Sequence, residues 1–109
     1  MQLTLRQSGY FLADVEAQFR WYLAEAGPEV VRRHRQAVQA TLAKLIHLPD
    51  LGRLRFANDP ELTRMRSCTV IKPFNKQLLF YRVVGETLVA ERTIHGARDL
   101  PRRLKEPPQ

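Results

Sequence analysis

Two short apolar runs that flank Gly85-Glu86 constrain the fold of this chain more than any other feature. The runs, at 77–84 and 87–94, are rich in Val, Leu, Phe and Tyr, which are typical of β-strands. A two-residue loop that begins with Gly is typical of a type II′ turn, so the sequence predicts an antiparallel hairpin. The polar segment 95–99 follows the second strand directly, and we expect it at the edge of the sheet.

The turn also assigns the strand side chains to two faces, because Val84 then lies opposite Thr87. The face expected to pack on helices carries Leu79, Tyr81, Val83, Leu88, Ala90 and Ile94. The other face, more mixed and expected to be partly open, carries Leu78, Phe80, Arg82, Val89, Glu91 and Thr93.

Apolar residues in the first half of the chain recur three or four positions apart, as in amphipathic helices. We expect one helix from about Phe11 to Gly27 and a second from Pro28 to Pro49, joined so tightly that they form an antiparallel hairpin. The buried stripe predicted for the first helix is Leu12, Val15, Phe19, Tyr22, Leu23 and Ala26. The stripe predicted for the second is Val31, His34, Val38, Thr41, Leu42 and Leu45.

Further strands are predicted at 2–6 and at 62–71, where Arg64 and Arg66 would share one face. Residues 53–60 look like a loop. The order β-α-α-β-β-β predicts an α+β fold of two layers, with the helical hairpin packed against a mainly antiparallel sheet.

The chain has 109 residues, enough for one domain with a modest core, which we place at residues 1–100. Residues 101–109 are basic and rich in proline, and we expect a tail that frays, with at most one helical turn.

The charge of the chain favours an anionic partner. Its 18 basic and 11 acidic residues give a net charge of +7, which suits nucleic acid or an acidic protein segment, although solubility alone is another explanation. The chain shows no apolar run of the roughly 20 residues that would span a membrane and no signal-peptide pattern. Its single cysteine, Cys68, cannot form an internal disulfide, so we expect a cytoplasmic protein.

A few side chains are candidates for a functional site. Arg64, Arg66 and Arg82 would form an anion site if they met on one open sheet face, but surface arginines that cover apolar area are the more common arrangement. His95 is either a general acid or base or a structural residue at the end of a strand. Trp21 either seals the edge of the core or contacts a partner.

No cofactor or metal is predicted. The three histidines lack the spacing of metal ligands, and the chain has neither a Gly-rich phosphate loop nor a recognisable nucleophile triad.

The order and spacing of these elements resemble the RelE/ParE superfamily, the toxins of type II toxin–antitoxin modules. The residues that carry the resemblance are 21–27 at the end of the first helix, 48–53 after the second, Met65-Arg66, Pro73-Phe74, 79–83 and 92–99. One departure is His34, where relatives often carry Phe.

The resemblance implies one of three functions. RelE-like members cut mRNA on the ribosome, and the catalytic residues here would then be Arg66, Arg82, His95 and Arg98. ParE-like members inhibit DNA gyrase and are not known as nucleases. A degenerate member would bind only its antitoxin.

The ParE branch is favoured, and with it a protein that is not an enzyme. Residues 53–61 lack the paired lysines of the RelE pattern, and no tyrosine follows Tyr81. The implied partners are DNA gyrase, or ribosome and mRNA in the alternative, and a short acidic antitoxin that folds on the toxin as a hetero-oligomer. The predicted partner-binding residues are Trp21, Arg64, Arg66, Phe80, Arg82, His95 and Arg98.

Overall fold

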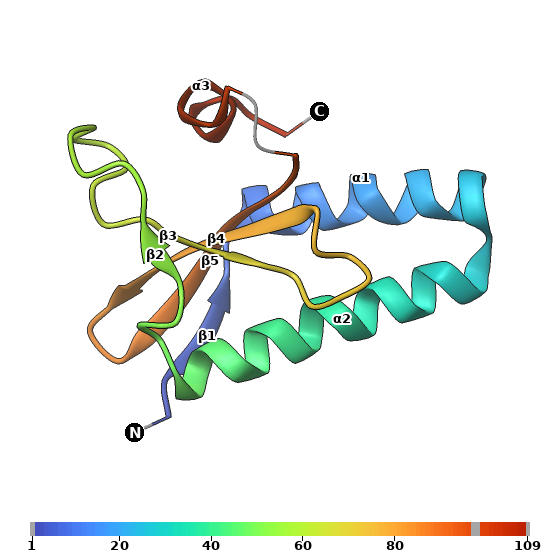
Figure 1. Ribbon diagram of the computed structural model, residues 1–109, viewed down its shortest axis with the longest axis horizontal. Coiled ribbons are helices and arrows are strands. Elements are labelled where there is room, and N and C mark those ends of the chain that lie inside the picture. The colour runs from blue at the N-terminus through green and yellow to red at the C-terminus, as the bar shows by residue number, and fades with distance from the viewer. Residues whose placement is uncertain (1, 97–98, 109) are drawn as a thin grey trace.

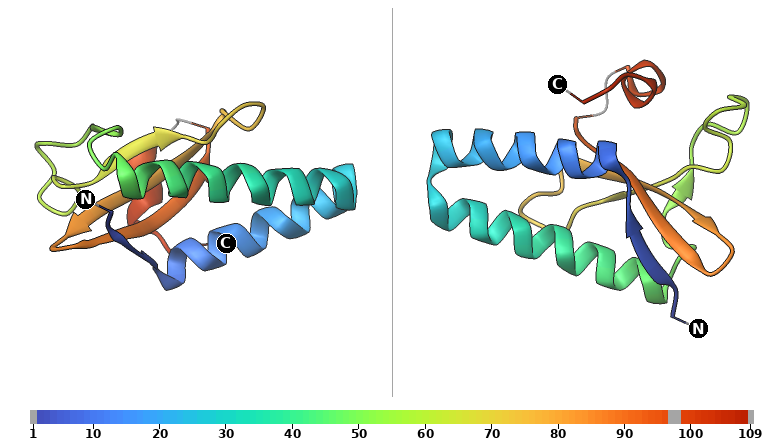
Figure 2. Two further views of the ribbon diagram at one scale, coloured as in Figure 1. Left: turned by 90° about the horizontal axis from the view of Figure 1, so that it is seen from below. Right: turned by 180° about the vertical axis from the view of Figure 1, so that it is seen from behind.

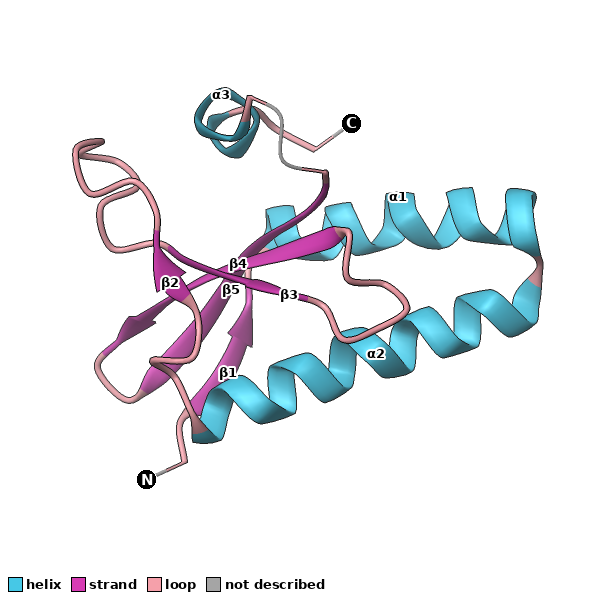
Figure 3. Ribbon diagram, in the orientation of Figure 1, coloured by secondary structure: helices cyan, strands magenta, loops and turns pink. Residues whose placement is uncertain are grey.

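Two long helices and a five-stranded sheet form the two layers of the protein, seen in a computed structural model that describes residues 2–96 and 99–108 (Figure 1). Helices α1 (Gly9–Ala26) and α2 (Pro28–His47) run antiparallel and cover one face of the sheet, as Figure 2 shows from two further sides. The α+β prediction is confirmed, because helices and strands fall into separate layers (Figure 3).

The sheet has the strand order β1-β5-β4-β3-β2. Its strands are β1 (Thr4–Gln7), β2 (Arg53–Leu54), β3 (Arg66–Thr69), β4 (Gln77–Val84) and β5 (Thr87–His95). Strand β1 pairs parallel with β5, and the other pairs are antiparallel. The first strand therefore lies beside the last, which brings the start of α1 close to β5.

The predicted hairpin between β4 and β5 is confirmed at its turn. Val84 pairs with Thr87, and Gly85 has a φ of 60°, which the first position of a type II′ turn requires. Further along, the register shifts between Phe80 and Tyr81, so that Glu91 has no direct partner on β4.

This bulge reverses the predicted faces at the end of β5. Thr93 pairs with Leu79 and lies on the helix side, whereas Ile94 pairs with Leu78 and lies on the other side. The sequence prediction was the opposite for both residues, because a bulge inserts one residue into a period of two.

Each face of the sheet has its own apolar cluster. The cluster beneath the helices contains Leu3, Phe11, Ala37, Val38, Leu42, Leu45, Val70, Leu79, Tyr81, Leu88 and Ala90. The cluster on the other face contains Leu62, Met65, Phe80, Ile94, Leu100 and Leu104. The face that we expected to be partly open is therefore covered at one end, and Phe80 is fully buried there.

That cover comes from two segments that differ from the prediction. Residues 62–64 lie in a turn and Met65 is outside any strand, and the side chains of Leu62 and Met65 both pack into the second cluster. The segment predicted to fray contains helix α3 (Leu100–Lys105), which buries Leu100 and Leu104. Within the predicted loop 53–60, the first two residues form β2.

The buried face of α1 also differs from its apolar stripe. Leu12 and Leu23 are 51% and 44% exposed, while Asp14 is buried beside Phe11. Residues 14 and 18 of the helix face the edge of β5, so polar side chains are needed there. The stripe predicted for α2 is confirmed, since every residue in it is buried.

Candidate functional site

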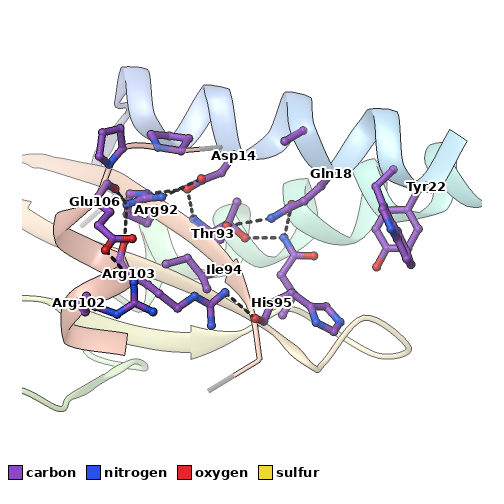
Figure 4. A pocket seen from close by; sticks show the side chains of 15 residues that line it. Asp14, Gln18, Tyr22, Arg92, Thr93, Ile94, His95, Arg102, Arg103 and Glu106 are labelled. Carbon is purple, nitrogen blue, oxygen red and sulfur yellow. Dashed lines mark hydrogen bonds and ion pairs between the residues drawn. The ribbon is translucent and has the colours of Figure 1, made fainter. Parts of the chain in front are cut away.

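A pocket of about 520 Å³ lies where α1, the end of β5 and the C-terminal segment meet (Figure 4). Residues of α1 from Asp14 to Tyr22 form one wall, and Arg92–His95 lie across from them. Residues of the C-terminal segment, from Arg102 to Pro108, close the third side. Segments almost eighty residues apart in sequence thus share one concave site.

The backbone of β5 is exposed to hydrogen bonding here because β1 pairs with β5 only as far as Ala90. Side chains of α1 and the residue before it take the place of a strand. The Ser8 hydroxyl donates to the carbonyl of Glu91 at 2.9 Å, and the Gln18 amide donates to the carbonyl of Thr93 at 2.9 Å. The Asp14 carboxylate accepts from the Thr93 N–H at 3.0 Å. This strand edge is therefore satisfied without a further strand.

Arg92 is the most connected charged side chain of the site. Its Nε and Nη2 donate to the two carboxylate oxygens of Asp14 at 2.8 and 3.0 Å. Its Nη1 donates to the carbonyls of Arg103, Leu104 and Glu106 at 3.0, 3.2 and 2.7 Å. The two side chains of this ion pair are only 7% and 9% exposed, so the charges are compensated inside the protein.

A buried chain of hydrogen bonds continues from this pair toward α2. The Gln77 amide donates to the Gln18 side-chain oxygen at 2.7 Å and to the Thr93 hydroxyl. Because the Gln77 nitrogen is occupied as a donor, its oxygen accepts from Nε2 of His34 at 2.7 Å. No buried side-chain nitrogen or oxygen in the described part of the chain lacks a partner.

His34 ends this chain among aromatic rings. Its ring centroid lies 4.7 Å from that of Tyr22 and 5.1 Å from that of Phe74. Burial lowers the pKa of His34, and the bond to Gln77 acts in the opposite direction. The prediction of a packed histidine is confirmed, with a ring that fills the place of an aromatic residue.

The predicted site residues Trp21 and His95 both line this pocket. Trp21 is 60% exposed, so it does not seal the core, and its ring packs edge-on against Tyr22 at 5.1 Å. His95 ends β5 with an exposed side chain, and its carbonyl accepts from Arg103 at 2.9 Å. Arg98, also predicted, lies outside the described residues.

The three arginines of the predicted anion site do not come together. Arg64 lies in the turn before β3 rather than in a strand. Arg66 pairs with Tyr81 in the sheet, so it shares that residue's face, and it contacts the Gly52 carbonyl and Asp50 at 2.7 and 3.3 Å. Arg82 follows Tyr81 directly and therefore lies on the opposite face, where it binds Glu91 at 2.7 Å.

Asp14, Gln18, Gln77 and Arg92 were not predicted from the sequence. Asp14 and Gln18 lie four residues apart, on one helix face. Polar residues at this spacing beside apolar neighbours were the one pattern that could have indicated a buried polar site, but a solvent-exposed helix face has the same pattern.

Three further observations concern the described residues. They contain no cluster of three His, Cys, Asp or Glu side chains that would hold a metal ion. Cys68 is partly buried against the first core cluster, and burial raises the pKa of its thiol. None of the described helices is both long enough and apolar enough to cross a membrane.

Comparison with known proteins places the chain in one family. A chain of the chromosomal ParDE TA system from P. aeruginosa has the same fold, with a TM-score of 0.71 and 20% sequence identity over 88% of this chain and 98% of that one. A comparison with curated proteins gives no match. The family model for the ParE toxin of the type II toxin–antitoxin system parDE matches residues 5–100. The chain therefore belongs to the ParE family of type II toxins.

Proposed function

We propose that this ParE-family protein arrests bacterial growth by binding DNA gyrase in the cytoplasm and that a cognate acidic antitoxin neutralises it in a hetero-oligomeric complex. The observation that carries the proposal is the match of the ParE family model to residues 5–100. Gyrase inhibition is the activity that resemblance to the ParE branch implies.

The geometry of the predicted catalytic residues supports binding rather than RNA cleavage. A metal-free ribonuclease needs a base and an acid close to one phosphate. Arg66 and Arg82 lie on opposite faces of the sheet, and each is paired with a carboxylate. His95 is at the end of β5, in a pocket that neither arginine lines. These three residues therefore do not form one reaction centre.

The exposed face of α1 supports the proposal of an antitoxin partner. Leu12 and Leu23 are three helical turns apart on one side of the helix, and both are about half exposed. Two exposed apolar side chains on one side of a helix in a basic protein suit an acidic amphipathic segment that folds on binding.

The predicted partner contacts fall into two groups. Trp21, Arg64 and His95 have exposed side chains and, with Arg98, are proposed to touch a partner directly. Arg66 and Arg82 are partly buried in ion pairs, and Phe80 is fully buried. These three would affect partner binding only indirectly, by stabilising the structure beneath the exposed contact residues.

Growth of bacteria that express the protein tests the proposal. We expect growth to slow on induction and to recover when the cognate antitoxin is co-expressed. Leu12→Asp with Leu23→Asp should keep the toxicity but weaken the rescue, because two carboxylates would face an acidic partner. Leu48→Asp, at an exposed leucine outside α1, is the matched control and should leave the rescue intact. Normal growth at confirmed soluble expression would favour a degenerate toxin instead.

A further inference from the structure

Arg92 joins three parts of the fold through one buried side chain. It belongs to β5, its carboxylate partner Asp14 belongs to α1, and its three carbonyl partners belong to the end of α3 and the residue after it. The ring of Tyr10 covers the guanidinium, with Cζ 5.4 Å from the ring centroid. We refer to Asp14 and Arg92 with these carbonyls as the clasp.

The clasp stabilises the C-terminal end of α3. This helix has six residues, and a helix of that length is not stable in water on its own. Its last carbonyls have no partners within the helix, and a positive charge at that end is favourable. Arg92 supplies both the hydrogen-bond donors and the charge.

Arginine is required for this arrangement by geometry. The guanidinium is a planar fork, so one edge can bind a carboxylate with two parallel bonds while a third nitrogen points elsewhere. The ammonium group of a lysine is a single point and would not reach the carboxylate and the carbonyls together. The position therefore distinguishes Arg from Lys even though the charge is the same.

The held segment carries exposed basic side chains, of which Arg102 lines the pocket and Lys105 lies against the loop before β3. The Arg102 side chain is 63% exposed, and that of Lys105 is 37% exposed. Lys105 contacts Asp59 at 2.8 Å, which attaches α3 to the loop before β3. Together with Leu100 and Leu104 in the second cluster, these contacts give the segment one orientation relative to β5.

We propose that Asp14 and Arg92 are positioning residues, which hold residues 100–108 against α1 in the orientation that growth inhibition requires. The inference rests on the proposed function, because it says how Asp14 and Arg92 hold the basic C-terminal segment of the toxin in place. Neither residue needs to touch the target.

Two conservative variants test the clasp in the full-length protein. Arg92→Lys keeps the charge and loses the fork, and Asp14→Asn keeps the shape and loses the carboxylate. We expect trypsin to cleave folded protein after Arg102, Arg103 and Lys105 about tenfold faster or more in both variants, which intact mass measures. A change of that size corresponds to the loss of one charge-assisted hydrogen bond.

Two controls separate release of the segment from a general loss of stability. Leu42→Ala weakens the other core cluster, so it measures how much lower stability alone increases the cleavage rate. Arg32→Lys changes an exposed arginine that pairs with Glu29, and it should cleave like wild type. The clasp would be overturned if its variants were cleaved at the wild-type rate. It would also be overturned if they were cleaved no faster than Leu42→Ala is for the same loss of unfolding free energy.

Growth assays on the same variants test the second half of the proposal. Both clasp variants should lose growth inhibition while they still bind the antitoxin. Full toxicity with a released segment would overturn the requirement for this orientation. If the wild-type protein left growth unaffected, the proposed function would be contradicted, and the claim that growth inhibition needs this orientation would be overturned with it. The cleavage rates would still decide whether the clasp exists.

Discussion

At the scale of single residues, Gly52 shows why a small side chain is needed in the segment after α2. A Cβ at this position would lie 2.7 Å from the Tyr81 ring and 2.9 Å from the Ser67 carbonyl. The Gly52 N–H also donates to the Tyr81 hydroxyl at 2.9 Å, and that hydroxyl donates to the Pro49 carbonyl at 2.6 Å. The buried tyrosine thus fixes the path of the chain into β2.

Gly52→Ala should therefore destabilise the protein by about 1–3 kcal/mol, the usual cost of an added methyl group in a packed interior. Urea unfolding measures the change. Gly9→Ala is the matched control, since a Cβ at Gly9 would meet nothing within 4 Å. Equal stability of the two variants would show that the contact at Gly52 relaxes freely.

We expect His34 to make the free energy of unfolding depend on pH. Burial lowers its pKa from the ordinary value of 6.5, so the unfolded chain binds a proton at a higher pH than the folded protein does. Stability is then fully present above about pH 6.5 and falls as the pH drops below that value.

His34→Phe should remove this dependence while it keeps the ring contacts with Tyr22 and Phe74. The comparison is the slope of unfolding free energy between pH 7.5 and about pH 5.5, above the range where ordinary carboxylates titrate. The variant loses a bond to Gln77, so its absolute stability is expected to be lower at every pH. Identical slopes in both proteins would contradict a depressed pKa at His34.

At the scale of secondary structure, the start of α1 and the bulge of β5 are joined through Ser8. Its hydroxyl oxygen caps the helix by accepting from the Phe11 N–H at 3.0 Å, and the same hydroxyl donates to the Glu91 carbonyl at 2.9 Å. One side chain therefore satisfies an orphan donor of a helix and an orphan acceptor of a strand.

Ser8→Ala removes both bonds and should cost about 1–2 kcal/mol, the upper part of the range for helix caps. Ser8→Asp keeps the cap acceptor but cannot donate to Glu91, so its stability should lie between those of Ser8→Ala and wild type. Thermal or urea unfolding of the three proteins gives the order. Asp as destabilising as Ala would show that the cap itself contributes little.

The same elements show how much of the structure could be predicted from the sequence. The turn at Gly85 and the helix hairpin at Gly27-Pro28 follow from local residue types, and both were correct. The reversal of Thr93 and Ile94 was not predictable, because nothing in the local sequence of β5 marks a bulge at Glu91, whose carbonyl is bonded by Ser8, 83 residues away.

The site was harder to predict than the fold. Apolar periodicity favoured Leu12 and Leu23 as core residues, although the structure leaves both exposed and buries Asp14. A carboxylate is buried here because an arginine 78 residues away pairs with it, and no local pattern records such a partner. The pocket that contains Trp21 and His95 arises from the same long-range packing.

At the scale of the whole molecule, the protein has two proposed binding surfaces, one on α1 and one on the C-terminal segment. The outer side of α1 presents exposed apolar residues for an antitoxin, and the C-terminal segment presents Arg102 beside the pocket for a target. The net charge of +7 would speed association with acidic partners at either surface.

Inhibition of DNA gyrase by the purified protein is the most direct test of this account. A supercoiling assay should show inhibition by wild type, a clearly weaker effect for Arg102→Glu, which reverses an exposed charge of the C-terminal segment, and a small change for His95→Ala. In induced cells, mRNA should remain intact. Unimpaired supercoiling, together with codon-positioned mRNA cuts that disappear in His95→Ala, would contradict the gyrase proposal and establish a ribonuclease.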